Sequence, residues 1–124
     1  MSSNDAAHLK LGQESEALAC TYLQSQGLRL LMRNFRCKLG EIDLIMQDKQ
    51  ALVFVEVRSR ATRDAYSPLA SISTSKQQRL LRSSQVFLQK QSQLSHYPCR
   101  FDVIGITYGQ ETPHIEWVKH ALSS

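Results

Sequence analysis

Residues 41–58 constrain the fold more than any other part of the chain, because two segments typical of β-strands lie there on either side of a short polar sequence. That sequence, Gln47-Asp48-Lys49-Gln50, has the length and composition of a hairpin turn. Hydrophobic residues alternate on both sides of it, which predicts one strand over 41–46 and another over 51–58. Two consecutive strands joined in this way pair with each other and run antiparallel.

The alternation also predicts which side chains share a face of each strand. In the first strand we expect Ile42, Leu44 and Met46 on one face, and Glu41, Asp43 and Ile45 on the other. In the second strand the two faces are Val53, Val55 and Val57, and Leu52, Phe54, Glu56 and Arg58.

Segments on either side of this hairpin complete an α/β fold. A helix is predicted over 7–26, where Leu11, Leu18 and Tyr22 recur at helical spacing and Gly27 follows as a stop signal. The other predicted elements are a strand over 28–34, a helix over 74–92 capped by Ser73 or Thr74, a strand over 100–107 and a short strand over 114–119. The second helix is long enough to cross over between parallel strands. The order is α-β-β-β-α-β, which predicts a mixed central sheet flanked by helices.

Length and composition predict one domain, residues 1–124 with a core over about 7–119. The chain has 124 residues, of which 42% are hydrophobic and 21% charged, which excludes a disordered or collagenous protein. Its longest apolar run, 51–55, is far shorter than the roughly 20 residues of a membrane span. The first five residues lack the features of a signal peptide. The three cysteines form no C-x-x-C pair, as expected of thiols in a reducing compartment, and we expect a cytoplasmic protein.

Basic residues are concentrated in one region. Residues 60–100 contain seven lysines and arginines against Asp64 alone, a net charge of +6, whereas the whole chain carries +4. Such a region suits a nucleic-acid backbone. Charge alone fits a solvated helix face equally well.

Two carboxylates, Asp43 and Glu56, lie within apolar strands. A buried carboxylate is costly unless it is paired or binds a metal. An ion pair with Arg58, two residues on, or a place at an exposed sheet edge would explain Glu56 without any functional role. The alternative is a Mg²⁺ site: adjacent strands lie about 4.8 Å apart, so both carboxylates could reach one ion. The backbone carbonyl of Val57 could add a third ligand.

Several stretches of the chain, in order, resemble those of the YraN family, small bacterial proteins related to archaeal Holliday junction resolvases within the PD-(D/E)XK nuclease superfamily. The stretches are Gly12-Gln13-Glu14-Ser15-Glu16-Ala17-Leu18-Ala19, Arg33-Asn34-Phe35-Arg36-Cys37, Gly40-Glu41-Ile42-Asp43-Leu44-Ile45, Phe54-Val55-Glu56-Val57-Arg58-Ser59-Arg60, Lys76-Gln77-Gln78-Arg79-Leu80 and Arg100-Phe101-Asp102-Val103-Ile104. The resemblance implies the restriction-endonuclease-like α-β-β-β-α-β core, and a relation to resolvases suggests a homodimer.

The resemblance also implies roles for individual residues. Glu16 takes the place of the first-helix Glu, Asp43 that of the metal-ligand Asp, and Glu56 that of the Glu in the E-x-K pair. Arg58 replaces the Lys of that pair, and Ser15 stands where the family usually has Gly. Arg is always protonated and cannot act as a base, although it can stabilise charge on a phosphate. Lys76 could supply the missing ammonium group from the second helix.

Three functions follow from these patterns. The first is Mg²⁺- or Mn²⁺-dependent hydrolysis of DNA, branched or single-stranded forms included, with a weakly bound ion and with Glu16, Asp43, Glu56 and Arg58 as catalytic residues. The second is a nucleic-acid-binding module that keeps the fold without the activity. The third is a protein-interaction subunit whose basic helix faces an acidic partner. For the first two, we expect nucleic acid to contact Arg36, Lys38, Arg60, Lys76, Arg79 and Arg82.

Overall fold

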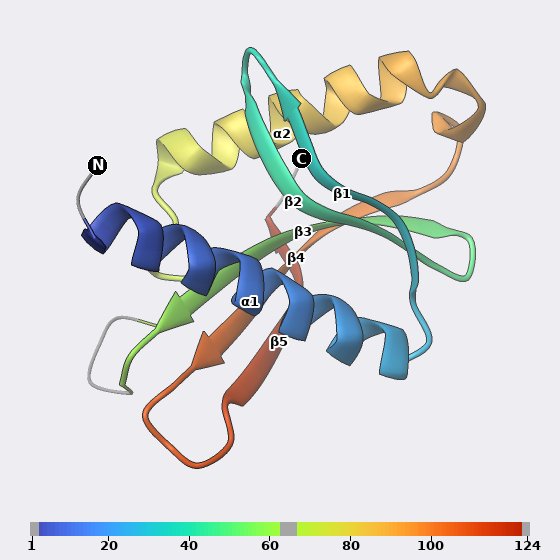
Figure 1. The fold of residues 1–124 in the computed structure, drawn as a ribbon. Helices are drawn as coiled ribbons and strands as arrows, with labels where there is room; N and C mark the ends of the chain where they lie inside the picture. The colour runs from blue at the N-terminus through green and yellow to red at the C-terminus, as the bar shows by residue number, and fades with distance from the viewer. Residues whose placement is uncertain (1–2, 63–66, 123–124) are drawn as a thin grey trace.

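The computed structural model describes residues 3–62 and 67–122, shown as a ribbon in Figure 1. Its elements are α1 (Ser3–Ser25), β1 (Arg29–Cys37), β2 (Gly40–Asp48), β3 (Ala51–Arg60), α2 (Thr74–Lys90), a short 3-10 helix (Ser92–Leu94), β4 (Cys99–Thr107) and β5 (His114–Leu122). This order confirms the predicted α-β-β-β-α-β core, followed by the expected fifth strand. Arg63 and Asp64, which entered the charge count above, lie outside the described residues.

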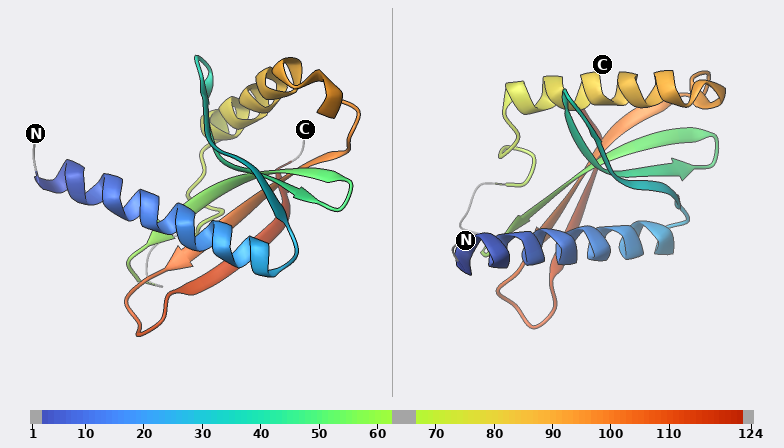
Figure 2. Two further views of the ribbon diagram at one scale, coloured as in Figure 1. Left: turned by 45° about the vertical axis from the view of Figure 1, so that its right-hand side comes forward. Right: turned by 45° about the horizontal axis from the view of Figure 1, so that its top comes forward.

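The five strands form one mixed sheet in the order β1-β2-β3-β4-β5. Neighbouring strands are antiparallel except β3 and β4, which are parallel and are connected through α2. The helices lie on opposite faces of the sheet, α2 above it and α1 below it in the right-hand view of Figure 2. Because β3 is the central strand, an exposed sheet edge does not explain the carboxylate of Glu56.

The hydrophobic core has two parts, one on each face of the sheet. The part under α1 contains the buried residues Ala19, Cys20, Leu23, Leu28, Leu44, Met46, Val53, Val55, Ile104 and Ile106. The part under α2 contains Phe35, Ile42, Ile45, Leu52, Phe54, Leu80, Phe87 and Phe101. The predicted faces of β3 are therefore confirmed. Leu11 is an exception in α1, since it is 40% exposed. The N-terminal part of this helix extends past the sheet in the left-hand view of Figure 2.

One predicted face of β2 is wrong. Ile42 packs with Ile45 under α2 and not with Leu44 under α1. The pairing of β2 with β3 ends at Leu44 and Val55, whereas the pairing of β2 with β1 continues to the turn between Cys37 and Gly40. Beyond Leu44 the hairpin is therefore a two-stranded ribbon, and such ribbons twist more strongly than the interior of a sheet.

Both long helices have defined ends. Ser73 caps α2, where its hydroxyl oxygen accepts a hydrogen bond from the backbone N–H of Lys76 at 3.1 Å. Gly27 follows α1 with a φ of 97°, a left-handed conformation that glycine adopts without strain. No helix in the described part of the chain is long and apolar enough to cross a membrane.

Candidate metal centre and basic groove

Asp43 and Glu56 lie where β2 and β3 separate. The register that pairs Leu44 with Val55 places Asp43 opposite Glu56, on the same face of the sheet, just past the last paired residues. Here the backbone N–H of Val57 donates a hydrogen bond to Asp43 Oδ2 at 2.8 Å. A side chain has thus replaced the backbone of β2 as a partner of β3, and the carboxylates face each other across the gap.

Both carboxyl groups have a raised pKa, and burial is the main cause. Glu56 is only 4% exposed, and its burial, followed by the nearby charge of Asp43, raises its pKa to about 8. Burial also raises the pKa of Asp43, although the hydrogen bond from Val57 opposes the shift. A protonated Glu56 donates a hydrogen bond to Asp43, which favours the ionised form of the latter.

When Glu56 is ionised, its two carboxylate oxygens have very different surroundings. Its Oε1 faces two cations, Lys76 Nζ at 3.7 Å and Arg58 Nε at 3.8 Å. Its Oε2 is buried and accepts no hydrogen bond from any residue that the structure describes. When Glu56 is charged, a bound cation would satisfy this oxygen, so the pair Asp43 and Glu56 has the chemistry of a metal site.

The two cations beside Glu56 are held differently. The Arg58 guanidinium also donates a hydrogen bond from Nη2 to the backbone oxygen of Ser71 at 2.9 Å, so it fastens the segment before α2 to β3. Lys76 projects from the first turn of α2. The ion pair expected between Glu56 and Arg58 is present, and the ammonium group of Lys76 stands at nearly the same distance from the same oxygen.

A second group of carboxylates surrounds Asp43. Oxygens of Glu16, Glu41 and Asp43 all lie within 4.8 Å of one another. Partial burial and the charges of Asp43 and Glu41 raise the pKa of Glu16 to about 7. Asn34 joins two of these residues. With its amide nitrogen turned toward the carboxylates, the orientation that gives the amide hydrogen-bond partners, it donates to Glu16 Oε1 at 2.7 Å and to Glu41 Oε1 at 3.1 Å.

Sequence reasoning missed Glu41 and Asn34 as members of this group. The spacing of Glu41, two residues before Asp43 on the same predicted face of β2, was an available signal. Nothing comparable pointed to Asn34. Its backbone has a φ of 54°, in the left-handed region that asparagine tolerates better than most residues.

A groove of about 390 Å³ lies between the β1–β2 hairpin and α2. Its lining residues are Arg36, Cys37, Gly40, Glu41, Lys76, Arg79 and Leu80. Three of these are cations that we predicted to contact nucleic acid. Because Glu41 and Lys76 also contact the carboxylates described above, the groove adjoins the candidate metal centre.

The other predicted nucleic-acid contacts are distributed around this groove or away from it. Lys38 is exposed at the tip of the β1–β2 hairpin, and Arg82 is exposed on α2, one turn beyond Arg79. Arg60 does not line the groove, and its Nε donates to Thr107 Oγ1 at 2.8 Å.

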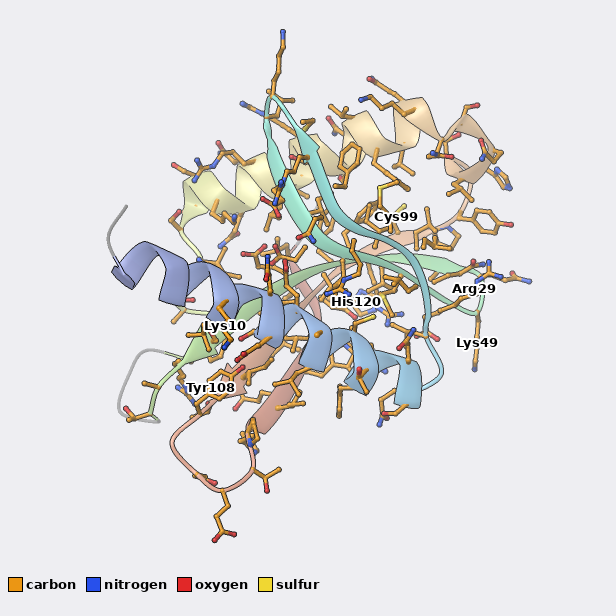
Figure 3. All side chains as sticks on the ribbon, in the orientation of Figure 1. Lys10, Arg29, Lys49, Cys99, Tyr108 and His120 are labelled. Carbon is orange, nitrogen blue, oxygen red and sulfur yellow. The ribbon has the colours of Figure 1, made fainter. Side chains whose placement is uncertain are left out.

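Ser15 has a partner within the fold. It is 2% exposed, and its hydroxyl forms a hydrogen bond of 2.9 Å with the hydroxyl of Tyr108. Tyr108 lies beneath α1 in Figure 3. This contact joins α1, at the residue before Glu16, to the residue that follows β4. The hydrogen bond explains how a polar side chain is accommodated at a position where the motif of the family resemblance has Gly.

Comparison with known sequences identifies the family. The profile of the group described as "Uncharacterised protein family UPF0102" matches residues 15–106. The chain belongs to this family. A UPF0102 protein of Nitrosococcus oceani is 47% identical over 117 residues, which cover 94% of this chain and 94% of that protein. One of Saccharophagus degradans is 50% identical over 95% of this chain and 97% of its own, and one of Pseudomonas aeruginosa is 43% identical over 91% and 92%.

Membership in UPF0102 confirms the family resemblance drawn from the motifs. The matched residues run from the buried Ser15 to Ile106 in β4, so they include both carboxylate groups and the basic groove. The relatives bear only the family name.

Proposed function

We propose that this UPF0102 protein binds nucleic acid in the basic groove and hydrolyses a phosphodiester bond with Mg²⁺ or Mn²⁺. Asp43 and Glu56 would hold the ion together with the backbone carbonyl of Val57. The observation that carries the proposal is the buried Oε2 of Glu56. Within the described part of the chain this oxygen has no hydrogen-bond partner, and the candidate ligands around it are all oxygens. Hard oxygen ligands are those that Mg²⁺ prefers.

The groove would position the substrate. Arg36, Lys76 and Arg79 line it and present positive charge beside the carboxylates. A nucleic-acid backbone is bound largely through such phosphate contacts. Lys38 and Arg82, at the rim, would extend the contact along the strand.

Lys76 and Arg58 together would replace the single Lys of the nuclease motif, one by contacting the phosphate and the other by positioning Glu56. Lys76 Nζ is 3.7 Å from Glu56 and lines the groove, so it can face the phosphate and stabilise charge in the transition state. Arg58 is fixed to Ser71 by a hydrogen bond and would hold Glu56 in place. A bound divalent cation supplies the remaining chemistry, because it polarises the phosphoryl oxygen and makes water more acidic.

A cleavage assay tests this function. Linear, single-stranded and branched DNA would be incubated with Mg²⁺, with Mn²⁺ and with chelator. We expect metal-dependent cleavage of at least one form, and a loss of about 10²-fold or more in Asp43→Asn, which keeps the shape of the side chain and removes its charge. Glu14→Gln, an exposed acid on α1, is the matched control. Absence of cleavage of every form with both metals would contradict the proposal.

A second candidate is a nucleic-acid-binding module without catalytic activity. The observation that favours it is Arg58, a permanent cation that is occupied in fastening Ser71 and stands at the position of the motif Lys. This module would bind DNA in a salt-sensitive way without cleaving it. Absence of DNA binding altogether would favour the third function, a protein-interaction subunit.

A further inference from the structure

The turn of the β1–β2 hairpin has an unusual composition. It consists of Lys38 and Leu39, between the paired residues Cys37 and Gly40. Two-residue hairpin turns usually contain Asn, Asp or Gly, because the favoured turn types need a positive φ. Neither residue of this turn has a positive φ, whereas Lys49, in the polar turn between β2 and β3, has a φ of 57°. Local turn preference therefore does not account for Leu39.

Leu39 is exposed at the end of this hairpin. Among the large hydrophobic residues that are exposed in the described part of the chain, it has the highest exposed fraction, 42%. Figure 1 shows the hairpin rising past α2, so that its turn stands clear of the sheet. A single exposed leucine is common in proteins, and the surroundings of Leu39 therefore decide what it can contact.

These surroundings are cationic. Lys38 precedes Leu39 and is exposed, and the side chain of Arg36 on β1 is 74% exposed. Arg82 on α2 is also exposed, and it directly precedes Ser83, which contacts the hairpin. An apolar side chain among exposed cations is complementary to a nucleic acid, which has an anionic backbone and apolar base faces.

The hairpin is firmly supported by α2. A Cβ atom on Gly40 would lie 3.1 Å from Ser83 Oγ and 3.4 Å from Arg79 Cβ, so the backbone of the hairpin approaches the helix closely. Cys37 Sγ donates a hydrogen bond to Ser83 Oγ at 3.6 Å. The turn therefore presents Leu39 from a rigid base, which favours its insertion into a partner.

We propose that Leu39 is a wedge that inserts where paired nucleic-acid strands separate. Apolar side chains of several DNA-binding proteins insert between base steps and unstack them. The last base pair before a fork has a stacked neighbour on one side only, so opening it costs less than opening a continuous duplex. The substrate class is therefore DNA with a fork, flap or branch. The inference rests on the proposed binding of nucleic acid in the basic groove.

The groove leads from the wedge to the candidate metal centre. Gly40 and Glu41 line it, and β2 continues from them to Asp43, three residues beyond Gly40. At about 3.3 Å per residue, this part of the strand spans about 10 Å. Stacked nucleotides follow one another at about 3.4 Å along one strand, so cleavage is expected within about three nucleotides of the junction.

The fluorescence of the base analogue aminopurine tests the wedge without cleavage. The analogue is placed in the last base pair of a forked DNA, in the presence of chelator, and its fluorescence rises when it is unstacked. We expect the full chain to raise the signal at the fork and not at the same base inside a continuous duplex. Leu39→Ser should lose most of this rise, and Leu39→Met, which restores an apolar side chain, should recover it. DNA affinity at low salt should change much less, because the phosphate contacts remain.

Leu11→Ser is the matched control. Leu11 is 40% exposed, and it belongs to α1, which lies on the other face of the sheet from α2 (Figure 2). This variant should keep the wild-type signal and affinity. A wild-type signal in Leu39→Ser, or an equal loss of signal in Leu11→Ser, would overturn the wedge.

A cleavage assay with Mg²⁺ separates the wedge from the proposed hydrolysis. The wild type should cleave forked DNA faster than linear duplex, and Leu39→Ser should lose this preference while it still cleaves single strands. Metal-dependent cleavage without any preference for a fork would overturn the wedge and leave the proposed function standing. Unstacking at the fork without cleavage by either metal would support the wedge and contradict hydrolysis. Absence of DNA binding would overturn both proposals.

Discussion

Lys76 Nζ lies 3.7 Å from Glu56 Oε1, an ion pair that joins the first turn of α2 to the central strand of the sheet. The N-cap by Ser73 fixes the backbone of Lys76, and the side chain is 30% exposed toward the groove. The lysine is therefore placed to neutralise Glu56 and to meet a phosphate. Arg58 Nε, on the same strand as Glu56, lies 3.8 Å from the same oxygen.

We expect Lys76→Ala to lower metal-dependent cleavage by about 10²–10⁴-fold, because a positioned cation or proton donor is lost next to the reacting phosphate. Arg58→Lys should raise cleavage above the wild-type level and should partly restore the activity of Lys76→Ala, since it returns a compact ammonium group to the motif. Initial rates on the best DNA form check both. Lys38→Ala, at the exposed hairpin tip, is the matched control and should change DNA affinity more than rate. Equal rates for Lys76→Ala and wild type would contradict the assignment.

The buried Glu56 should make the protein less stable as the pH rises. Its pKa is about 8 in the folded protein against an ordinary value of 4.5, so between these values the folded state binds more protons than the unfolded state. The free energy of unfolding must then fall with rising pH. One pKa unit corresponds to about 1.4 kcal/mol, and we expect a loss of at least about 1 kcal/mol between pH 5 and pH 8. Urea unfolding in the presence of chelator measures it.

Glu56→Gln supplies the comparison for this pH dependence. It keeps the shape of the side chain and cannot ionise, so the fall in stability should be smaller than in the wild type. Millimolar Mg²⁺ should restore stability at pH 8 in the wild type more than in the variant, because the ion binds the charged form. Glu14→Gln should behave as the wild type. Identical pH profiles for wild type and Glu56→Gln would show that another group is responsible.

The element types were predictable because they depend on local patterns. The alternation in β3, the stop at Gly27 and the cap at Ser73 are all settled within a few residues, and the structure has each of them. The prediction that Asp43 and Glu56 are neighbours also needed only a hairpin and its register. The strand boundaries were less exact: β1 was expected to end at residue 34 and continues to Cys37.

The features that could not be predicted depend on contacts between segments that are distant in the sequence. The face of Ile42 depends on the point at which β2 leaves β3, which no local pattern specifies. The same separation brings Glu41 and Asn34 toward Glu16 of α1, and no local pattern in the sequence specifies that these residues meet. The exposure of Leu11 has a similar origin, because a helical pattern does not show how far a helix extends past the sheet.

The basic groove should set the salt dependence of DNA binding. Each phosphate neutralised contributes about −0.9 to the slope of log K against log salt on duplex DNA. We expect Arg79→Ala to reduce the magnitude of this slope by about one unit and to weaken binding at low salt. Fluorescence anisotropy with a labelled duplex at several salt concentrations, in the presence of chelator to prevent cleavage, provides the measurement.

Arg29→Ala is the matched control for the groove. Arg29 is an exposed arginine at the other end of β1, where its Nη2 donates to Gln47 Oε1 at 2.8 Å, and it lies far from α2 in Figure 3. It should leave the slope unchanged. A similar loss of slope in both variants would mean that the surface attracts DNA by its overall charge and not through the groove.

Gly105 in β4 should be intolerant of any side chain. A methyl group there would overlap the ring of Pro68, with Cβ only 2.5 Å from Pro68 Cβ. Pro68 belongs to the segment that also provides the backbone oxygen of Ser71 to Arg58, so the close approach at Gly105 helps to hold that segment over the parallel pair β3–β4.

We expect Gly105→Ala to lower the free energy of unfolding by about 1–3 kcal/mol, as overpacking usually does. Gly12→Ala is the control. This glycine lies in α1, where the added carbon would meet no described atom within 4 Å apart from its own helix backbone and chain neighbours, and the change should stabilise the protein by about 0.5–1 kcal/mol. Urea unfolding of the two variants should therefore shift in opposite directions, and an unchanged midpoint for Gly105→Ala would show that the segment before α2 moves aside without cost.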